Sequence, residues 1–468
     1  MVHSGDKKRM RVSRFSYLNG STRLWAVGSL AVLGGQPVAA STSVVAEPLS
    51  FNECVHYALT QNPEMTLSAA RIQQAKSALS KAESGRLPQI NLSLTAANTT
   101  NALSAFGMKL QQQSVMADDF SLDTLNNPDA YTDFNTRIEM TLPVWNGGKM
   151  GHYEAQASEM ILAAKQGDLA MQQYLTYSVY HAYEAIHAAR AHIQVAEQAK
   201  RTAEAFVQTT QNLVNEGVVV RSELLSAKVH FSMAEARLLE AKGNEIMALD
   251  RLRILMNQET STSIEVADRV DLTLPADSVE ALLALALESN PKLRAKQKEV
   301  ASSRYDVRIA NADQYPRFNI MMRQEWNHDA LALEANSYTV AGVLSWNVLD
   351  FGVTKSAVDM ASSAVIQKRA ALKSQENSVR LNVLLNWQKK QVERKQVQTD
   401  QLAVEHAAEA QNLVLKRYEG GLATMTEVLA SQTQLDETKA ELVSAKFDVN
   451  IYKAKLRLAT GTMSLEQL

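Results

Sequence analysis

Three histidines on one stretch of this 468-residue chain are the first side chains that could bind a metal ion. His181, His187 and His192 follow one another at spacings of 187 − 181 = 6 and 192 − 187 = 5 residues. Metal ligands on one helix face are three or four residues apart, whereas spacings of five and six turn the imidazoles away from one another. The chain has no H-E-x-x-H motif, and Cys54 is its single cysteine. We therefore expect no metal site.

Glycine pairs could mark a phosphate-binding loop, and a serine between glycines could mark a nucleophile. Gly147-Gly148 and Gly420-Gly421 stand outside the G-x-x-x-x-G-K-[ST] and G-x-G-x-x-G contexts that such loops require, and no G-x-S-x-G elbow occurs. We predict no catalytic residue and no cofactor site, so the chain is not expected to be an enzyme. A formal net charge of -2 gives no positive field for nucleic acid.

One acidic residue occurs twice in the same local setting. Glu223 follows the turn glycine Gly217, and Glu427 follows Gly420-Gly421, at a separation of 427 − 223 = 204 residues. In a local account, each carboxylate lies in the first turn of a helix and complements the positive end of the helix dipole. In a second account, both lie at the tip of a helical hairpin, where several copies form an acidic ring that attracts cations. Both accounts can hold together.

The sequence contains an internal duplication. Asn62-Pro63 recurs as Asn290-Pro291, at 290 − 62 = 228 residues, whereas Gly148 recurs as Gly352, at 352 − 148 = 204 residues. The difference of 228 − 204 = 24 residues lies between Asn91 and Pro143, so the first copy carries an extra loop there. Residues 101–133 are rich in Asp, Asn and Ser, and we interpret them as a long polar surface loop.

Each copy predicts one shorter helix and one long helical hairpin. Proline-free stretches of Ala, Gln, Glu, Lys and Leu favour long helices, which need coiled-coil partners along their length. The expected helices are 51–86, 150–213 and 222–255 in the first copy, and 279–314, 353–419 and 426–458 in the second.

Between these helices the hydrophobic pattern changes to period two. Ile90, Leu92 and Leu94 alternate with polar residues, and each copy contains two such segments of about ten residues. Such segments suit a lipid-facing barrel, although a soluble sandwich would give the same alternation. Four strands cannot close a barrel alone, and lipid does not tolerate an open edge. A barrel of such segments therefore needs several copies of the chain, and a trimer would give twelve strands. Outside the barrel we expect a mainly α-helical chain, with Gly147, Gly148 and Gly352 at the strand-to-helix junctions.

The N-terminus predicts export. Basic residues precede a short apolar stretch, residues 24–33, and small residues follow it, which is typical of a secretory signal peptide cleaved near Ala40 or Ala46. Ten apolar residues are too few to cross a bilayer as a helix. The expected organisation is a signal peptide (1–40), a first repeat (41–257, strands about 88–100 and 134–146), a linker (258–277), a second repeat (278–461, strands about 316–327 and 338–350) and a tail (462–468).

The duplicated pattern resembles the TolC family of outer-membrane efflux and secretion channels over about residues 49–461. The matching motifs are Ala58-Leu59-Thr60-Gln61-Asn62-Pro63, Leu142-Pro143-Val144-Trp145-Asn146-Gly147-Gly148, Trp346-Asn347-Val348-Leu349-Asp350-Phe351-Gly352 and Arg417-Tyr418-Glu419-Gly420-Gly421-Leu422-Ala423-Thr424-Met425-Thr426-Glu427-Val428-Leu429.

The resemblance implies a homotrimer with a twelve-stranded barrel, a periplasmic α-barrel and an equatorial region built partly from the segments near 41–60, 258–280 and the C-terminus. It also implies docking to a periplasmic adaptor (membrane fusion) protein and an inner-membrane transporter of the RND or ABC type. Glu223 and Glu427 match the acidic residues at the family's tip, and Tyr418 matches its locking tyrosine. Two positions depart from the pattern: Ala430 replaces a second acid of some members, and Ala423 a basic locking residue, so that particular salt bridge is not expected to hold the tip closed.

The function expected on these grounds is a passive trimeric conduit in the outer membrane of a Gram-negative bacterium, which exports small molecules received from the pump and adaptor. One alternative is the outer-membrane component of a type I protein secretion system. An alternative of another class is an exported structural coiled coil without a pore, although such a protein has no need for two lipid-compatible strand pairs.

Overall fold

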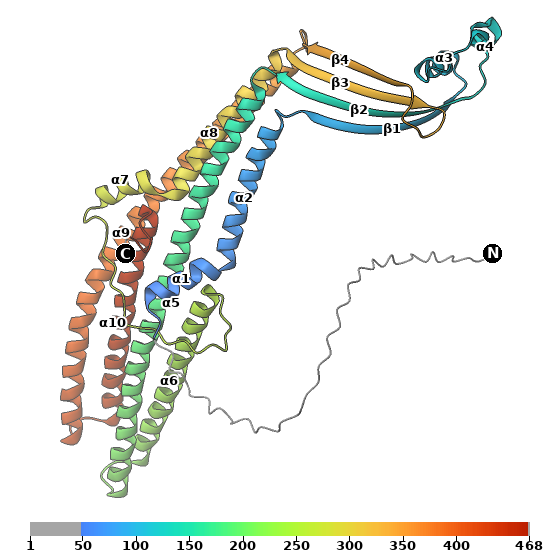
Figure 1. Ribbon diagram of the computed structural model, residues 1–468. Coiled ribbons are helices and arrows are strands. Elements are labelled where there is room, and N and C mark those ends of the chain that lie inside the picture. The colour runs from blue at the N-terminus through green and yellow to red at the C-terminus, as the bar shows by residue number, and fades with distance from the viewer. Residues whose placement is uncertain (1–47, 467–468) are drawn as a thin grey trace, which may run out of the picture. The chain divides into compact units, whose positions relative to one another are not determined.

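The computed structural model describes residues 48–466 (Figure 1). The predicted signal peptide and both of its cleavage sites lie outside the described residues. The described part is mainly helical and contains a four-stranded antiparallel sheet, which confirms the predicted fold class. Its elements are α1 (Phe51–Gln61), α2 (Pro63–Ser84), β1 (Gln89–Thr99), α3 (Ala102–Gln111), η1 (Ala117–Phe120), α4 (Leu122–Asn126), β2 (Tyr131–Trp145), α5 (Lys149–Asn215), α6 (Arg221–Leu255), α7 (Val279–Ser289), α8 (Pro291–Asn311), η2 (Ala312–Gln314), β3 (Arg317–His328), β4 (Asn336–Ser345), α9 (Val353–Glu419) and α10 (Met425–Thr460).

The two halves of the chain contain the same principal elements in the same order. Helices α5 and α9 each have 67 residues, so each is about 100 Å long. Each turns at its end into a returning helix, α6 or α10, and the two hairpins reach the same end of the structure (Figure 1). None of the helices between residues 48 and 466 is both long and apolar enough to span a membrane.

The prediction of one continuous helix at the start of each copy is wrong, because a proline divides it. Asn62 has an extended backbone, and its side-chain oxygen accepts a hydrogen bond from the amide of Glu64, so α2 begins at Pro63. Asn290 does the same for α8, with Pro291 in the first turn. Proline is favoured at this first position, since its missing N–H has no partner there in any helix, and the residue before it is pushed out of the helical region.

The helices form a row that differs between its two levels. Near the sheet the order is α2, α5, α8, α9, and near the hairpin tips it is α6, α5, α10, α9, since these are the pairs in contact (Figure 1). Helix α9 is therefore at one edge throughout, and α2 and α6 share the other edge. The sheet has the order β1-β2-β3-β4, so its edge strands continue the same two edges: β1 follows α2, and β4 precedes α9.

A buried core joins the middle of the row to the chain segments around it. Phe51 packs edge-to-face on Tyr180 and Tyr183 at 5.7 and 5.8 Å between ring centroids. Val266, from the segment between α6 and α7, pairs with Leu49 in a parallel bridge and belongs to the same core. The fully buried Met463 adds a C-terminal member to this core. We call the core and the segments that form it the equatorial region, since they are the segments from which the resemblance predicts such a region.

Candidate functional site

The sheet has one apolar and one polar face. Cross-strand neighbours Leu92 and Ile138, and next to them Met140, Met322 and Val340, form a continuous apolar surface. The opposite face carries two cross-strand ion pairs, Arg137 with Glu325 at 2.5 Å and Arg323 with Glu139 at 2.8 Å, and a hydrogen bond from Asn135 to Asn327 of 2.8 Å. A sheet of this kind suits lipid on one side and water on the other.

Glycines at the strand-to-helix junctions take backbone conformations that other residues disfavour. Gly147 and Gly148 have φ of 66° and 79°, and Gly352 has φ of 95°. A Cβ on Gly147 would also lie 2.7 Å from the carbonyl oxygen of Ala312. Directly before the second junction, Asp350 accepts hydrogen bonds from the amides of Gly352 and Thr354, so α9 begins directly after the turn. Strand β4 accordingly ends at Ser345, earlier than the predicted position 350.

Both hairpin tips end in the same helix-closing turn. Gly217 and Gly421 have φ of 72° and 71°, whereas Gly420 remains near helical values with φ of -84°. The amide of Val218 donates to the carbonyl of Leu213, five residues earlier in the chain, and Leu422 does the same with Arg417. This is the Schellman pattern, in which a left-handed residue lets the chain satisfy the last free carbonyls of a helix.

The two acidic residues of the predicted ring have different local partners. Glu427 closes a capping box with Thr424: its carboxylate accepts from the amide of Thr424 at 2.7 Å, and the Thr424 hydroxyl accepts from the amide of Glu427. The backbone hydrogen bond from Thr424 lowers the pKa of Glu427. Glu223 lies in the first turn of α6 without a side-chain cap there, so its carboxylate is available to another helix.

That other helix is α9, through Tyr418. The Tyr418 hydroxyl lies 3.5 Å from a carboxylate oxygen of Glu223, a long contact for a hydrogen bond. The ring itself is buried among Phe206, Met425 and Val428, and burial raises the pKa of its hydroxyl. The structure therefore brings Tyr418 and Glu223 together across the two hairpins, whereas Glu427 is bound to its own cap.

One ion pair in the equatorial region was not among the residues predicted from the sequence. Glu184 of α5 is fully buried, and Arg269 from the segment between α6 and α7 donates to it at 2.6 Å, while the side-chain amide of Asn450 donates at 3.2 Å. The partners are 85 residues apart in the chain. No local pattern in the sequence marks such a pair, apart from an acidic residue within an otherwise apolar helix face.

The three histidines of α5 are packed separately. His181 lies edge-on to Phe447 at 5.7 Å, and His187 lies beside Tyr183 at 5.1 Å. Burial lowers the pKa of each of the three imidazoles. Between residues 48 and 466 no group of three or more His, Cys, Asp or Glu side chains could hold a metal ion. Cys54 of α1 is fully buried in the equatorial core.

Comparison with known proteins explains this arrangement. The family model described as outer membrane efflux protein matches residues 54–258 and 282–462, which is most of the chain. The chain belongs to this family. Alkaline protease secretion protein AprF of Pseudomonas aeruginosa is 21% identical over 344 residues, covering 71% of this chain and 70% of AprF.

Solved structures of other proteins have the same fold. VceC from Vibrio cholerae has a TM-score of 0.73 at 18% identity and covers 88% of this chain and 96% of its own. The open-state MtrE channel of Neisseria gonorrhoeae has a TM-score of 0.72 at 16% identity and covers 89% and 90%. The protein is thus an outer-membrane efflux channel with a helical periplasmic portion, and MtrE, which shares its fold, is described as an outer-membrane channel.

Proposed function

We propose that three copies of this efflux protein close head-to-tail into a passive conduit that exports small molecules received from an inner-membrane pump through a periplasmic adaptor. The observation that carries the proposal is the pair of free edges. Strand β1 with α2 and α6 forms one edge, and β4 with α9 forms the other. The first edge of one copy would therefore contact the second edge of its neighbour, so the two surfaces in the contact differ. Such a heterologous contact generates a closed ring when the rotation fits.

Both edges carry apolar residues that are about half exposed within one chain. On α6, Leu225, Val229 and Met233 follow one another at helical spacing and are 53%, 62% and 52% exposed. On α9, Leu381 and Leu385 repeat the spacing and are 55% and 54% exposed. Helices of this length without an apolar partner along one face are unfavourable in water, and a neighbouring copy supplies that partner.

The strand count favours three copies. The sheet contributes four strands per chain, and its edges must be paired in lipid. About eight strands enclose a space that side chains fill, whereas larger barrels leave a water-filled interior. A trimer with twelve strands is the smallest ring of this chain that leaves an aqueous passage.

At the hairpin tips, Glu223 and Glu427 would then supply two carboxylates per copy around one opening, with Tyr418 as a lock between the hairpins. The exposed position of Glu427 at its cap is compatible with both a local role and a role in the ring. Such a ring attracts cations and repels anions.

A planar bilayer experiment tests the conduit and the ring together. We expect trimers of the purified protein to insert and to conduct with a preference for cations. The joint variant Glu223→Gln and Glu427→Gln should reduce the ratio of cation to anion permeability, while the control Glu405→Gln, an exposed acid further along α9, should leave it unchanged. Purified protein that remains a water-soluble monomer and never enters liposomes would refute the conduit, and an unchanged permeability ratio would refute the ring alone.

Similarity to AprF, whose name describes protease secretion, favours a second candidate function, the outer component of a type I protein secretion system with an ABC transporter. Loss of the gene distinguishes the two candidates. Small-molecule efflux through an RND or ABC pump predicts greater sensitivity to toxic compounds, whereas protein secretion predicts a missing protein in the culture medium.

A further inference from the structure

The extra segment of the first copy, residues 101–130 between β1 and β2, lies where the composition predicts a long polar surface loop, and it contains short helices. We call it the insert. It contains α3, η1 and α4, and it lies at the ends of the strands furthest from the long helices (Figure 1). Side chains at its helix starts cap these helices: Asn101 accepts from the amide of Ser104, and Ser121 from that of Thr124.

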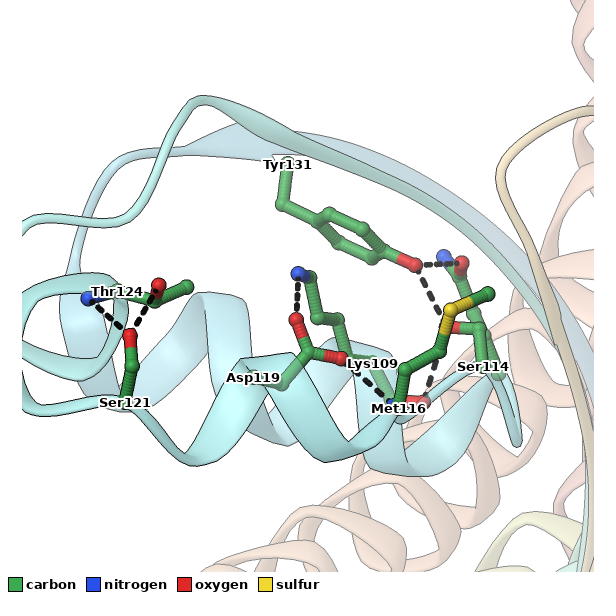
Figure 2. A network of polar contacts seen from close by, with 8 residues as sticks. Lys109, Ser114, Met116, Asp119, Ser121, Thr124 and Tyr131 are labelled. Atoms are coloured by element: carbon green, nitrogen blue, oxygen red, sulfur yellow. Dashed lines mark hydrogen bonds and ion pairs between the residues drawn. The ribbon is translucent and has the colours of Figure 1, made fainter.

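A polar network fixes the two parts of the insert to each other (Figure 2). Lys109 of α3 donates to Asp119 of η1 at 2.6 Å, and the same carboxylate accepts from the amide of Met116 at 2.8 Å. These hydrogen bonds lower the pKa of Asp119, so it remains a carboxylate. Next to them Phe106 and Phe120 pack edge-to-face at 5.7 Å. The contacts join α3 to η1 at several points, as expected of an element with a defined position.

The insert is also bound to β2, and on one particular face. The Gln112 side-chain amide donates to the carboxylate of Asp133 at 2.9 Å, while the Tyr131 hydroxyl donates to the Gln112 oxygen at 2.7 Å. Successive side chains of a strand point to opposite faces, so Tyr131 and Asp133 share a face with Arg137 and Glu139. Helix α3 therefore leans over the polar face of the sheet, at its outer end.

Polar side chains at this end of the face are buried. Asp133, Asn135 and Asn327 are 5%, 9% and 2% exposed, although a face lined with water would leave such side chains open. Further from the insert, on the same face, Arg323 and Glu139 keep 30% and 28% of their side chains exposed. At the end where α3 contacts β2, packing thus excludes water from the polar face of the sheet, although the residues of this face are of the kind that usually contacts water.

We propose that the insert narrows the outer opening of the conduit and sets an upper size limit on what leaves it. The inference rests on the proposed trimeric conduit, in which the polar face lines the passage. Three inserts, each bound through Gln112 to the inner wall of its own copy, would then reduce the opening from three sides. The corresponding connection of the second copy, residues 329–335, is much shorter and contains no helix, so the narrowing is assigned to the inserts.

Thiol labelling from outside the cell tests the inference. The full chain first receives Cys54→Ala, and then Thr141→Cys, on the polar face beyond the insert. Intact cells are treated with a series of maleimides of increasing size, of which the larger ones enter only through the outer opening. We expect a size limit for labelling of the intact chain, and a clear shift of that limit to larger reagents when residues 102–130 are replaced by a short Gly-Ser turn.

A milder variant guards against failure of the deletion to assemble. Lys109→Met with Gln112→Leu keeps the length of the insert but removes its hydrogen bonds to Asp119 and Asp133, and it should shift the size limit in the same direction. Met140→Cys, on the apolar face beside Thr141, is the matched control, since water-soluble reagents should not label it in either background.

Two results would overturn the inference, and they are distinguishable. An equal size limit in the intact chain and in both variants would show that the insert does not restrict the opening, and the conduit itself would stand. Labelling of Met140→Cys but not of Thr141→Cys, even with the smallest reagent, would show that the polar face does not line the passage. In that case the proposed conduit fails together with the inference.

Discussion

Replacing Arg269 by Met should open the equatorial region locally, because it leaves the fully buried Glu184 carboxylate without its counter-charge. Removing one partner of a buried ion pair costs about 3–5 kcal/mol, since the remaining charge keeps its desolvation penalty. The Arg269 side chain is 39% exposed, and Asn450 still donates at 3.2 Å, so the lower end of that range applies, about 3 kcal/mol. Arg269→Lys keeps the charge but not the two-pronged guanidinium, and should cost less.

Hydrogen exchange of the segment that carries Arg269 measures this cost directly. The amide of Ala267 donates to the carbonyl of Leu49 at 2.9 Å, so it exchanges only when the segment opens. A loss of about 3 kcal/mol in opening free energy corresponds to exchange roughly 100-fold faster. Arg86→Met, which removes an exposed pair with Glu154, is the control and should change the stability by less than about 1 kcal/mol.

A double variant separates charge burial from packing. Glu184→Leu with Arg269→Leu removes both charges, so we expect exchange at Ala267 close to that of the unmodified protein. The reasoning is wrong if Arg269→Met exchanges as slowly as the unmodified protein, or if the double variant is no better than Arg269→Met.

Three further predictions concern other parts of the molecule. Gly147→Ala should destabilise the first strand-to-helix junction by more than the roughly 1–3 kcal/mol of backbone strain, because its Cβ would also lie 2.7 Å from the Ala312 carbonyl oxygen. Gly352→Ala has open space around its Cβ and should show the backbone strain alone. Thermal unfolding followed by circular dichroism measures both effects. Burial lowers the pKa of His181, so the neutral form is favoured in the folded state, and stability should fall as the pH drops below about 6.5; His181→Phe should retain the contact with Phe447 and lose part of this pH dependence in melting temperatures. Tyr418→Phe should keep the buried packing of the ring and lower the free energy of unfolding by at most about 1 kcal/mol, because the contact with Glu223 is 3.5 Å long. Tyr418→Ala should lower it by about 3–5 kcal/mol in denaturant unfolding, because the buried ring is lost. Equal effects of the two variants would refute this reasoning.

Elements governed by local rules could be predicted from the sequence. The 67-residue helices lack proline and end at glycines, so their bounds agree with the expected 150–213 and 353–419 within a few residues. The strands could be predicted because each has one apolar and one polar face, a signal that depends on neighbouring residues alone.

Features that depend on distant partners could not be predicted. The composition of the insert is polar, but its helices are stabilised by contacts such as Lys109 with Asp119 and Gln112 with Asp133. The periodicity of hydrophobic residues in the sequence does not predict such contacts. Glu184 and Arg269 belong to different elements, and only the fold brings them together. The tip residues are an intermediate case. The spacing predicts Glu427 near a helix start, but the contact between Tyr418 and Glu223 depends on how the two hairpins pack.

The equal length of α5 and α9 restricts which changes of length the gene can accept. One residue added within either helix turns everything beyond it by about 100° and advances it by 1.5 Å, which would rotate the buried stripe away from its neighbours and leave the two tips at unequal depths. Changes of seven residues nearly restore the rotation but not the depth, unless both halves change alike. Insertions and deletions among natural variants should therefore accumulate in the connections at the sheet and in the segment between α6 and α7. They should be rare within the long helices α5 and α9.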